Sequence, residues 1–266
     1  MLRLMFLTVG ILLATLPASA QDWAKARLAK SPRHQEWVKI KHGDRTVQCF
    51  VVYPEVKTKA TAVVLIHEIF GLSDWARSTA DEVAEAGYIA IAPDLLSGMG
   101  PGGGGTSEFP DQDAVIKAVF ALPAEQVTAD LKAATDYVTK LSASNGKAAA
   151  AGFCWGGGQS FHFAADQPSI KAAFVFYGTP PTDEAVVARI GCPVYGFYAG
   201  NDARVTSTIP AAEALTKKAH KKYAPVIYDG AGHGFMRAGE APDANDANKK
   251  ARQEAWARWK SLLKKI

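Results

Sequence analysis

The segment GFCWG at residues 152–156 constrains the fold of this chain more than any other segment. The run from Lys147 to Gly152 has the small residues of a short buried strand, and the run from Gly157 to Asp166 has the composition of a helix. A very tight turn between a strand and a helix leaves no room for side chains two residues before and after its centre, so glycine is needed at both places. The pattern therefore predicts a strained and accessible side chain at Cys154.

Two interpretations of this turn are possible from the pentapeptide alone. In one class of hydrolases such a turn holds the nucleophile. Glycine-rich strand-to-helix turns also occur in nucleotide-binding folds, and a free cysteine is often only a small apolar residue of the core. A thiol nucleophile needs a base to take its proton and an acid to orient that base, so the rest of the chain has to supply both.

Asp202 and His233 follow Cys154 in the order acid, then histidine, that is found in α/β-hydrolases. The apolar strand expected at Pro193–Ala199 leads into Asp202, and the strand expected at Ala224–Tyr228 leads into the glycine-rich loop that contains His233. Both loops would open at the edge where parallel α/β sheets bind ligands. Separately, the aspartate would be a turn residue and the histidine a surface-loop residue. Their joint order and placement predict a Cys-His-Asp catalytic site.

Six short motifs along the chain form a set. They are HEIFGL at residues 67–72, APDL at 92–95, GFCWGG at 152–157, FYG at 176–178, ND at 201–202 and HGF at 233–235. The set resembles the dienelactone hydrolase family of α/β-hydrolases over about residues 62 to 237. The resemblance implies that Cys154, Asp202 and His233 form a catalytic triad. It also implies a hydrolase that cleaves a lactone or ester bond through a thioester acyl-enzyme, and no cofactor is expected.

The resemblance assigns roles to residues around this triad. Glu68 would bind the neutral resting thiol and take its proton when substrate arrives, which protects an oxidation-prone thiolate. The alternative for Glu68 is a carboxylate that caps a helix beginning near Ser73. The backbone N–H groups of Trp155 and Ile69 would form the oxyanion hole.

The expected substrate-binding residues are Arg237, Tyr177 and Phe70. Arg237 matches one of two arginines that hold the substrate carboxylate in the family, and its planar fork suits that group. The other arginine has no counterpart in the segment LSGM at residues 96–99. Arg204 and Arg77 are candidates to replace it, although an arginine in either place is more often a surface charge.

Residues 1–20 have the pattern of a secretory signal peptide. They contain one basic residue, Arg3, an apolar core from Leu4 to Leu16, and the small-residue cleavage sequence ASA at 18–20. The apolar run is too short to span a membrane comfortably. We therefore expect export to the periplasm or the extracellular medium, one α/β-hydrolase domain at residues 21–266, and no stable membrane insertion after cleavage.

The charge and the cysteine content of the chain restrict which ligands and cross-links are expected. A formal net charge of +4, spread along the chain, argues against a nucleic-acid partner. The expected partner is a small ester or lactone, neutral or anionic, and the protein would be a monomer or a homodimer. The family's strand order separates Cys49 from Cys192, so no disulfide is expected between them, and no Cys or His pair has the spacing of zinc ligands.

The alternation of strands and helices predicts a mainly parallel sheet of about eight strands, with an N-terminal antiparallel hairpin and helices on both faces. The remaining strands are expected at 36–41 and 45–53 (the hairpin), 61–66, 88–92 and 172–176, and the helices at 73–87, 128–141, 157–166 and 244–263. The glycine-rich stretch Ser97–Pro110 is expected to be either a mobile flap at the mouth of the site or a disordered surface insertion.

Three functions remain open from the sequence. The first is a dienelactone hydrolase-like lactonase or esterase for acidic substrates. The second is an exported carboxylesterase or thioesterase of broad range. The third is a non-catalytic binding protein on the same fold.

Overall fold

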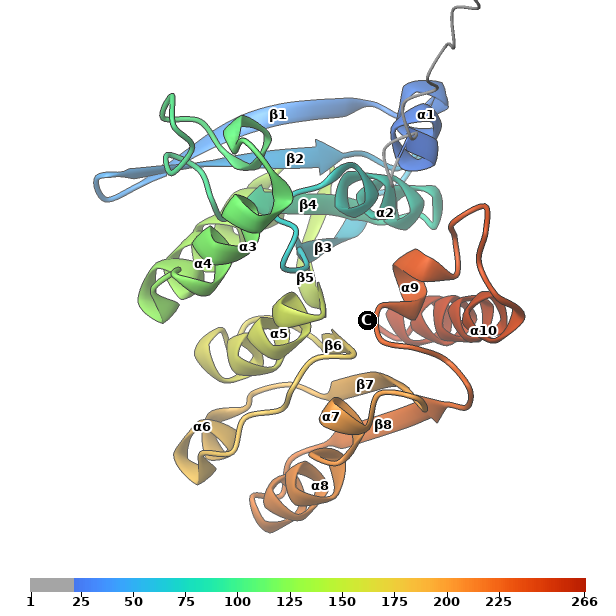
Figure 1. Cartoon of the computed structure of the whole chain (residues 1–266). Helices are drawn as coiled ribbons and strands as arrows, with labels where there is room; N and C mark the ends of the chain where they lie inside the picture. The colour runs from blue at the N-terminus through green and yellow to red at the C-terminus, as the bar shows by residue number, and fades with distance from the viewer. Residues whose placement is uncertain (1–21) are drawn as a thin grey trace, which may run out of the picture.

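The centre of the molecule is one eight-stranded sheet, seen in the computed structural model that describes residues 22–266 (Figure 1). The predicted signal peptide lies outside the described residues. In chain order the strands are β1 (Gln35–His42), β2 (Arg45–Val52), β3 (Ala60–Ile66), β4 (Ile89–Asp94), β5 (Ser144–Phe153), β6 (Ala173–Phe176), β7 (Val194–Ala199) and β8 (Tyr223–Tyr228). Their order across the sheet is β1-β2-β4-β3-β5-β6-β7-β8.

The sheet is parallel except at its N-terminal edge. β1 and β2 form the predicted hairpin, and β2 also runs antiparallel to β4. The pairs from β4 to β8 are parallel. The predicted mainly parallel sheet with an N-terminal antiparallel hairpin is confirmed.

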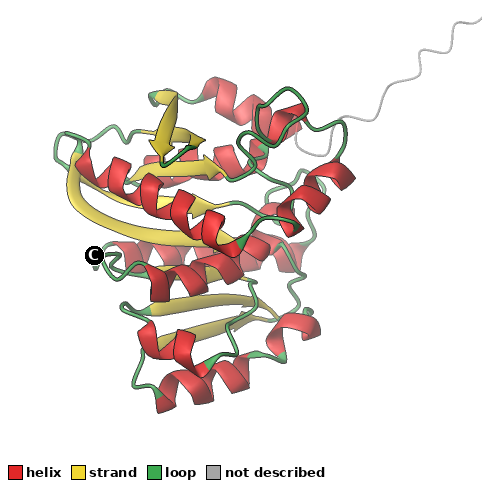
Figure 2. Ribbon diagram, turned by 90° about the vertical axis from the view of Figure 1, so that its left-hand side faces the viewer, coloured by secondary structure: helices red, strands yellow, loops and turns green. Residues whose placement is uncertain are grey.

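Helices cover both faces of this sheet (Figure 2). They are α1 (Asp22–Lys30), α2 (Asp74–Glu85), α3 (Gln112–Phe120), α4 (Ala124–Lys140), α5 (Trp155–Asp166), α6 (Glu184–Arg189), α7 (Ala203–Thr206), α8 (Ile209–Lys218), α9 (Phe235–Ala238) and α10 (Asp246–Leu263), with a short 3-10 turn, η1 (Thr106–Glu108). One core lies between the sheet and α1, α2 and α10, and the other lies between the sheet and α4, α5, α6 and α8.

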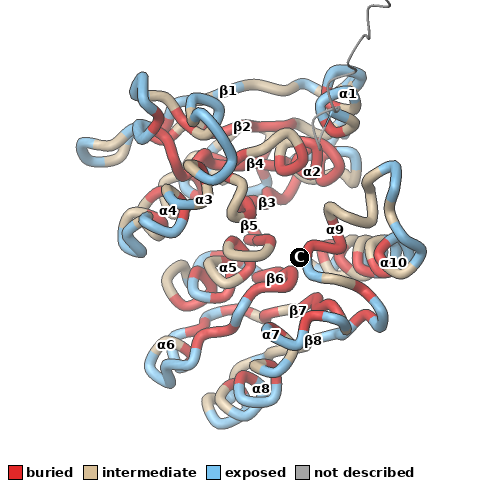
Figure 3. Tube along the Cα trace, in the orientation of Figure 1, coloured by how far each residue is buried: buried red, intermediate tan, exposed pale blue. Residues whose placement is uncertain are grey.

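Alternation along β3 explains how one strand serves both cores. Val63 and Leu65 belong to the core under α2 and α10, whereas Val64 and Ile66 belong to the core under α4 and α5. Successive side chains of a strand point to opposite faces, so a strand covered on both sides must be apolar at every position. All residues of β3 are buried, and the central strands form the buried interior in Figure 3.

The glycine-rich stretch Ser97–Pro110 is fixed by its own hydrogen bonds. Glu108 accepts bonds from the backbone N–H groups of Gly102 and Gly104 at 3.0 and 2.8 Å. Thr106 donates to Asp94 through its backbone N–H and its hydroxyl, each at 2.7 Å. These bonds contradict the alternative of a disordered insertion. No residue of the stretch lines the pocket described below.

Cys49 and Cys192 are buried free thiols. Cys49 lies in β2 and Cys192 lies just before β7, and four strands of the sheet separate β2 from β7. Within residues 22–266, no group of three or more His, Cys, Asp or Glu residues is arranged to hold a metal ion. In the same part of the chain no helix has the length and apolar character needed to cross a membrane.

Candidate active site

Cys154 lies in the predicted strained turn between β5 and α5. Its φ of 56° and ψ of −119° are values that L residues rarely adopt. The glycines around it permit a very close approach of backbone segments. A Cβ atom added to Gly152 would lie 1.8 Å from the carbonyl oxygen of Gly156, and one added to Gly156 would lie 2.3 Å from that of His67. Both glycines are therefore required by packing.

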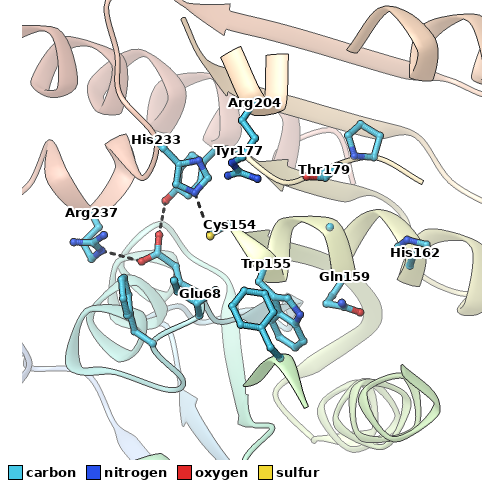
Figure 4. Close-up of a pocket in the computed structure, with 15 residues that line it drawn as sticks. Glu68, Cys154, Trp155, Gln159, His162, Tyr177, Thr179, Arg204, His233 and Arg237 are labelled. Carbon is cyan, nitrogen blue, oxygen red and sulfur yellow. Dashed lines mark hydrogen bonds and ion pairs between the residues drawn. The ribbon is translucent and has the colours of Figure 1, made fainter. Parts of the chain in front are cut away.

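His233 connects Cys154 to Asp202, and its contact with the Cys154 sulfur is drawn in Figure 4. Its Nε2 atom lies 3.1 Å from the Cys154 sulfur, and its Nδ1 atom lies 2.5 Å from Oδ2 of Asp202. Asp202 follows β7 and is buried, and His233 lies in the loop after β8. The fold brings the three predicted side chains together as one hydrogen-bonded chain.

Cys154 and His233 border a pocket of about 550 Å³. Near the sulfur its wall consists of Glu68, Tyr177 and Arg237. Away from the sulfur it runs beside α5. That outer part is lined by Trp155, Phe120, Gly158, Gln159, His162, Thr179 and Pro180.

Glu68 is buried at the end of β3 and is bound through both carboxylate oxygens. The Arg237 Nε atom donates to Oε2 at 2.8 Å, and the Tyr177 hydroxyl donates to Oε1 at 3.2 Å. Among the described residues no hydrogen bond joins Glu68 to Cys154, so the resting contact implied by the resemblance is absent from this conformation. The helix-capping alternative is wrong, because the side chain of Ser73 caps α2.

Opposing effects set the acidity of the Cys154 thiol. Burial raises its pKa to about 11, and the negative charge of Glu68 contributes to the rise. The backbone N–H groups of Trp155 and Ile69 act on the sulfur in the opposite direction and lower the pKa, as does the charge of Arg204. The thiol is therefore protonated at neutral pH when it is considered alone, and two backbone N–H groups favour its thiolate form.

The three candidate arginines differ in their surroundings. Arg237 is paired with Glu68 and lies over the Phe70 ring, with 4.9 Å between its guanidinium carbon and the ring centroid. Arg204 lines the pocket, and its guanidinium has no hydrogen-bond or ion-pair partner within residues 22–266. Arg77 is paired with Asp74 and does not line the pocket. Of the two candidates for the missing arginine, only Arg204 lies at the site.

Two more predicted residues border the pocket. Tyr177 is buried, has a φ of 40°, and meets the His233 ring edge-on, with 5.1 Å between centroids. Its hydroxyl is the second partner of Glu68. Phe70 lines the pocket beneath the Arg237 guanidinium.

Sequence reasoning missed the outer part of the pocket. Trp155, Gln159 and His162 recur at helical spacing and share one face of α5. This helix begins at the strained turn that holds Cys154, which we call the elbow. Because side chains three, four and seven residues apart lie on one side of a helix, this spacing could have indicated them. Phe120 and Thr179 carried no such signal.

The mainly parallel sheet, the strained elbow and the Cys-His-Asp chain together define an α/β-hydrolase. Residues 47–266 match the sequence model of the dienelactone hydrolase family, and the chain belongs to that family.

Curated relatives agree with this assignment, and solved structures share the fold. An inferred carboxymethylenebutenolidase of Salmonella typhi is 30% identical over 211 residues, which is 74% of each protein. One of Methylorubrum extorquens is 29% identical over 244 residues, covering 86% of this chain and 81% of the relative. An inferred dienelactone hydrolase from Klebsiella pneumoniae has the same fold, with a TM-score of 0.77 at 23% identity over 88% of this chain and 99% of its own.

A dienelactone hydrolase-like promiscuous phosphotriesterase, P91, from metagenomic libraries also has this fold. Its TM-score is 0.73 at 22% identity, over 88% of this chain and 98% of its own. Membership of the dienelactone hydrolase family makes the present protein a hydrolase of ester or lactone bonds.

Proposed function

We propose that this protein hydrolyses a lactone or ester with Cys154 as nucleophile, through a thioester acyl-enzyme. The observation that carries the proposal is the 3.1 Å distance between the Cys154 sulfur and Nε2 of His233, whose other nitrogen is bound to Asp202. A nucleophile within hydrogen-bond reach of a base that is itself oriented by an acid is the arrangement used for covalent acyl transfer.

In the first half of the reaction, His233 takes the thiol proton through Nε2 while Asp202 holds the proton on Nδ1. The thiolate attacks the substrate carbonyl carbon, and the N–H groups of Trp155 and Ile69 stabilise the resulting oxyanion. When the tetrahedral intermediate collapses, the bond to the alkoxy oxygen breaks and His233 returns the proton to that oxygen. Cys154 is then acylated as a thioester.

In the second half, water attacks the thioester carbonyl and gives its proton to His233. The carbon–sulfur bond breaks, the acid leaves and the thiol is regenerated with the proton held by His233. Glu68 acts before the chemistry, because its charge helps to keep the resting thiol neutral. A neutral thiol resists oxidation better than a thiolate does.

The pocket favours a substrate with an apolar body and an acidic group. Trp155, Phe120 and Phe70 give it aromatic walls. Arg204 supplies an unpaired positive charge, while the charge of Arg237 is balanced by Glu68. An anionic group of the substrate would therefore bind beside Arg204, with Arg237 available if Glu68 moves. The pocket volume of about 550 Å³ also supports the second candidate, an esterase of broad range.

We also propose that residues 1–20 direct export of the mature domain. Cell fractionation with an antibody against the mature chain tests this localisation. A protein found only in the cytoplasm with its first 20 residues intact would contradict it.

The catalytic proposal is tested with an activated aryl ester and a lactone. Cys154→Ala and His233→Ala should each abolish turnover above the uncatalysed rate, while Cys192→Ala, a change at a buried thiol outside the pocket, should retain it. Rapid quenching of the wild type should give a mass increase equal to the acyl group on the peptide that contains Cys154. Turnover by Cys154→Ala would refute the nucleophile.

A further inference from the structure

We propose that His67 is a positioning residue that aims the two N–H donors of the oxyanion hole. It does so by binding the peptide group that carries one donor and by stacking on the side chain of the residue that carries the other. This inference rests on the proposed function of Cys154.

The His67 ring makes one hydrogen bond within residues 22–266, and that bond goes to the backbone. The side chain is 1% exposed, and its Nδ1 atom lies 2.7 Å from the carbonyl oxygen of Glu68. A carbonyl oxygen can only accept, so Nδ1 must carry the proton. Burial lowers the pKa of the ring, which keeps it neutral and leaves Nε2 unprotonated.

This bond orients the Ile69 N–H group. The carbonyl of Glu68 and the N–H of Ile69 belong to the same planar trans peptide and point in opposite directions. The backbone N–H of Gly71 also donates to the Glu68 oxygen, at 3.2 Å. With its oxygen held from two sides, the peptide plane cannot rotate freely, and its N–H stays in the position from which it lowers the pKa of Cys154.

The face of the same ring packs on Trp155, the residue that carries the second N–H donor. The ring lies nearly parallel to the indole of Trp155, with 5.7 Å between centroids and 19° between planes. Trp155 is the first residue of α5, and its backbone N–H also lowers the pKa of Cys154. Gly156 allows the start of α5 to approach the backbone of His67, where no side chain would fit. One side chain therefore contacts both segments that bear the donors.

Two substitutions separate the two contacts. His67→Phe keeps a ring for Trp155 but removes the donor to Glu68. His67→Asn keeps a donor nitrogen at about the same distance from the backbone as Nδ1 but removes the ring. Loss of a complete oxyanion donor lowers kcat by about 10²- to 10³-fold. Because Gly71 still holds the Glu68 oxygen, we expect His67→Phe to lower kcat by about 10- to 100-fold, with KM changed less than about threefold.

The thiol gives a readout that a merely structural role would not move. The Ile69 N–H stabilises the thiolate, so its misalignment should shift the pH profile of iodoacetamide alkylation at Cys154 to higher pH. His67→Asn should restore part of kcat, because it keeps the bond to Glu68 but lacks the ring that stacks on Trp155, and it should return the alkylation profile toward that of the wild type. His34→Phe, a change of an exposed histidine on the surface, is the matched control and should behave as wild type.

Wild-type kcat and an unshifted alkylation profile in His67→Phe would overturn the proposal. So would an Asn variant that is no better than the Phe variant. If neither variant folds, nitrogen-15 spectra of the wild-type histidine rings decide the matter. A His67 ring protonated on Nδ1 supports the proposal, and one protonated on Nε2 overturns it. If wild-type turnover does not depend on Cys154, the proposed function fails, while alkylation and ring protonation still test the role of His67.

Discussion

Glu68 and Arg237 form an ion pair beside Cys154, with 2.8 Å between Oε2 and Nε (Figure 4). Tyr177, which follows β6, donates to the other carboxylate oxygen. Both oxygens are thus held, and the carboxylate acts on the Cys154 sulfur through its charge and not through a hydrogen bond. The sulfur is consequently free to face His233.

The first prediction concerns the resting thiol. Because burial and the Glu68 charge raise the pKa of Cys154 to about 11, the thiolate fraction should increase about tenfold per pH unit below that value. The rate of iodoacetamide labelling at Cys154 should therefore be low near pH 7 and rise until about pH 11. Labelling that is fast and independent of pH between about 7 and 9 would contradict this, since it would reveal a preformed thiolate.

The second prediction removes the charge of Glu68. Glu68→Gln keeps an oxygen that can accept a bond from Arg237 or Tyr177 but eliminates the negative field, so the pKa of Cys154 should fall. A charge a few ångströms away shifts a pKa by about one unit or more, which corresponds to about tenfold faster labelling at pH 8. Glu254→Gln, a change of an exposed carboxylate on α10, is the control. A labelling profile that stays unchanged in Glu68→Gln would show that the Glu68 charge does not affect the pKa of Cys154.

The third prediction concerns recognition of an acidic substrate. Arg204→Gln should raise KM about tenfold for an ester with a free carboxylate and leave KM for the matched neutral ester unchanged, because it removes the unpaired pocket charge. Arg77→Gln is the control, since Arg77 lies outside the pocket. Equal effects of Arg204→Gln on the two esters would contradict the role.

The fourth prediction tests Arg237, which the family resemblance assigns to the substrate carboxylate. If Arg237 binds the anionic group once Glu68 moves, Arg237→Ala should raise KM by about tenfold for the acidic ester and by much less for the neutral one. KM values that stay equally unchanged for both esters would remove Arg237 from the substrate site.

The elbow and the strand ends could be predicted because they depend on local constraints. Gly152 and Gly156 are dictated by contacts within one turn, and the carboxyl ends of parallel strands meet at one edge by topology. Asp202 and His233 therefore follow from sequence order alone. The same reasoning places Glu68 at the end of β3.

The partners of Glu68 could not be predicted in the same way. Arg237 is 169 residues from Glu68 in sequence, and the two meet only because α9 packs near the end of β3. No periodicity connects such residues. The stack between His67 and Trp155 has the same origin, since it joins segments that become neighbours when β3 pairs with β5.

Helix α1 was not predicted from the sequence, because its own residues give a weak signal. Its sequence is short and polar, and only Ala24 and Leu28 are buried in it. Isolated helices of this length are marginal in water, so most of the stability of α1 must come from tertiary contacts. Those contacts are the packing of Ala24 and Leu28 in the core and ion pairs of Arg27 with Glu82 of α2 and with Glu240, which follows α9.

The last prediction tests these ion pairs. Arg27 and Arg252 share the mostly buried carboxylates of Glu82 and Glu240. Burial and the Glu82 charge raise the pKa of Glu240, and the charges of Arg252 and Arg27 limit that rise. Arg27→Ala should lower the free energy of unfolding by about 1–2 kcal/mol, which is less than for a fully buried pair because Arg27 is about one-third exposed. Urea denaturation measures this loss.

The pH dependence of that loss distinguishes charge repulsion from lost packing. Without Arg27, the pKa of Glu240 in the folded state should rise further above its unfolded value, so the folded variant gains stability by binding a proton at low pH and loses it as pH rises. The deficit relative to wild type should therefore be larger at about pH 8 than at about pH 5. Arg189→Ala, which breaks an exposed pair with Asp166, should cost less than about 0.5 kcal/mol at both pH values. A deficit in Arg27→Ala that is the same at both pH values would mean that Arg27 stabilises α1 by packing and not by its charge.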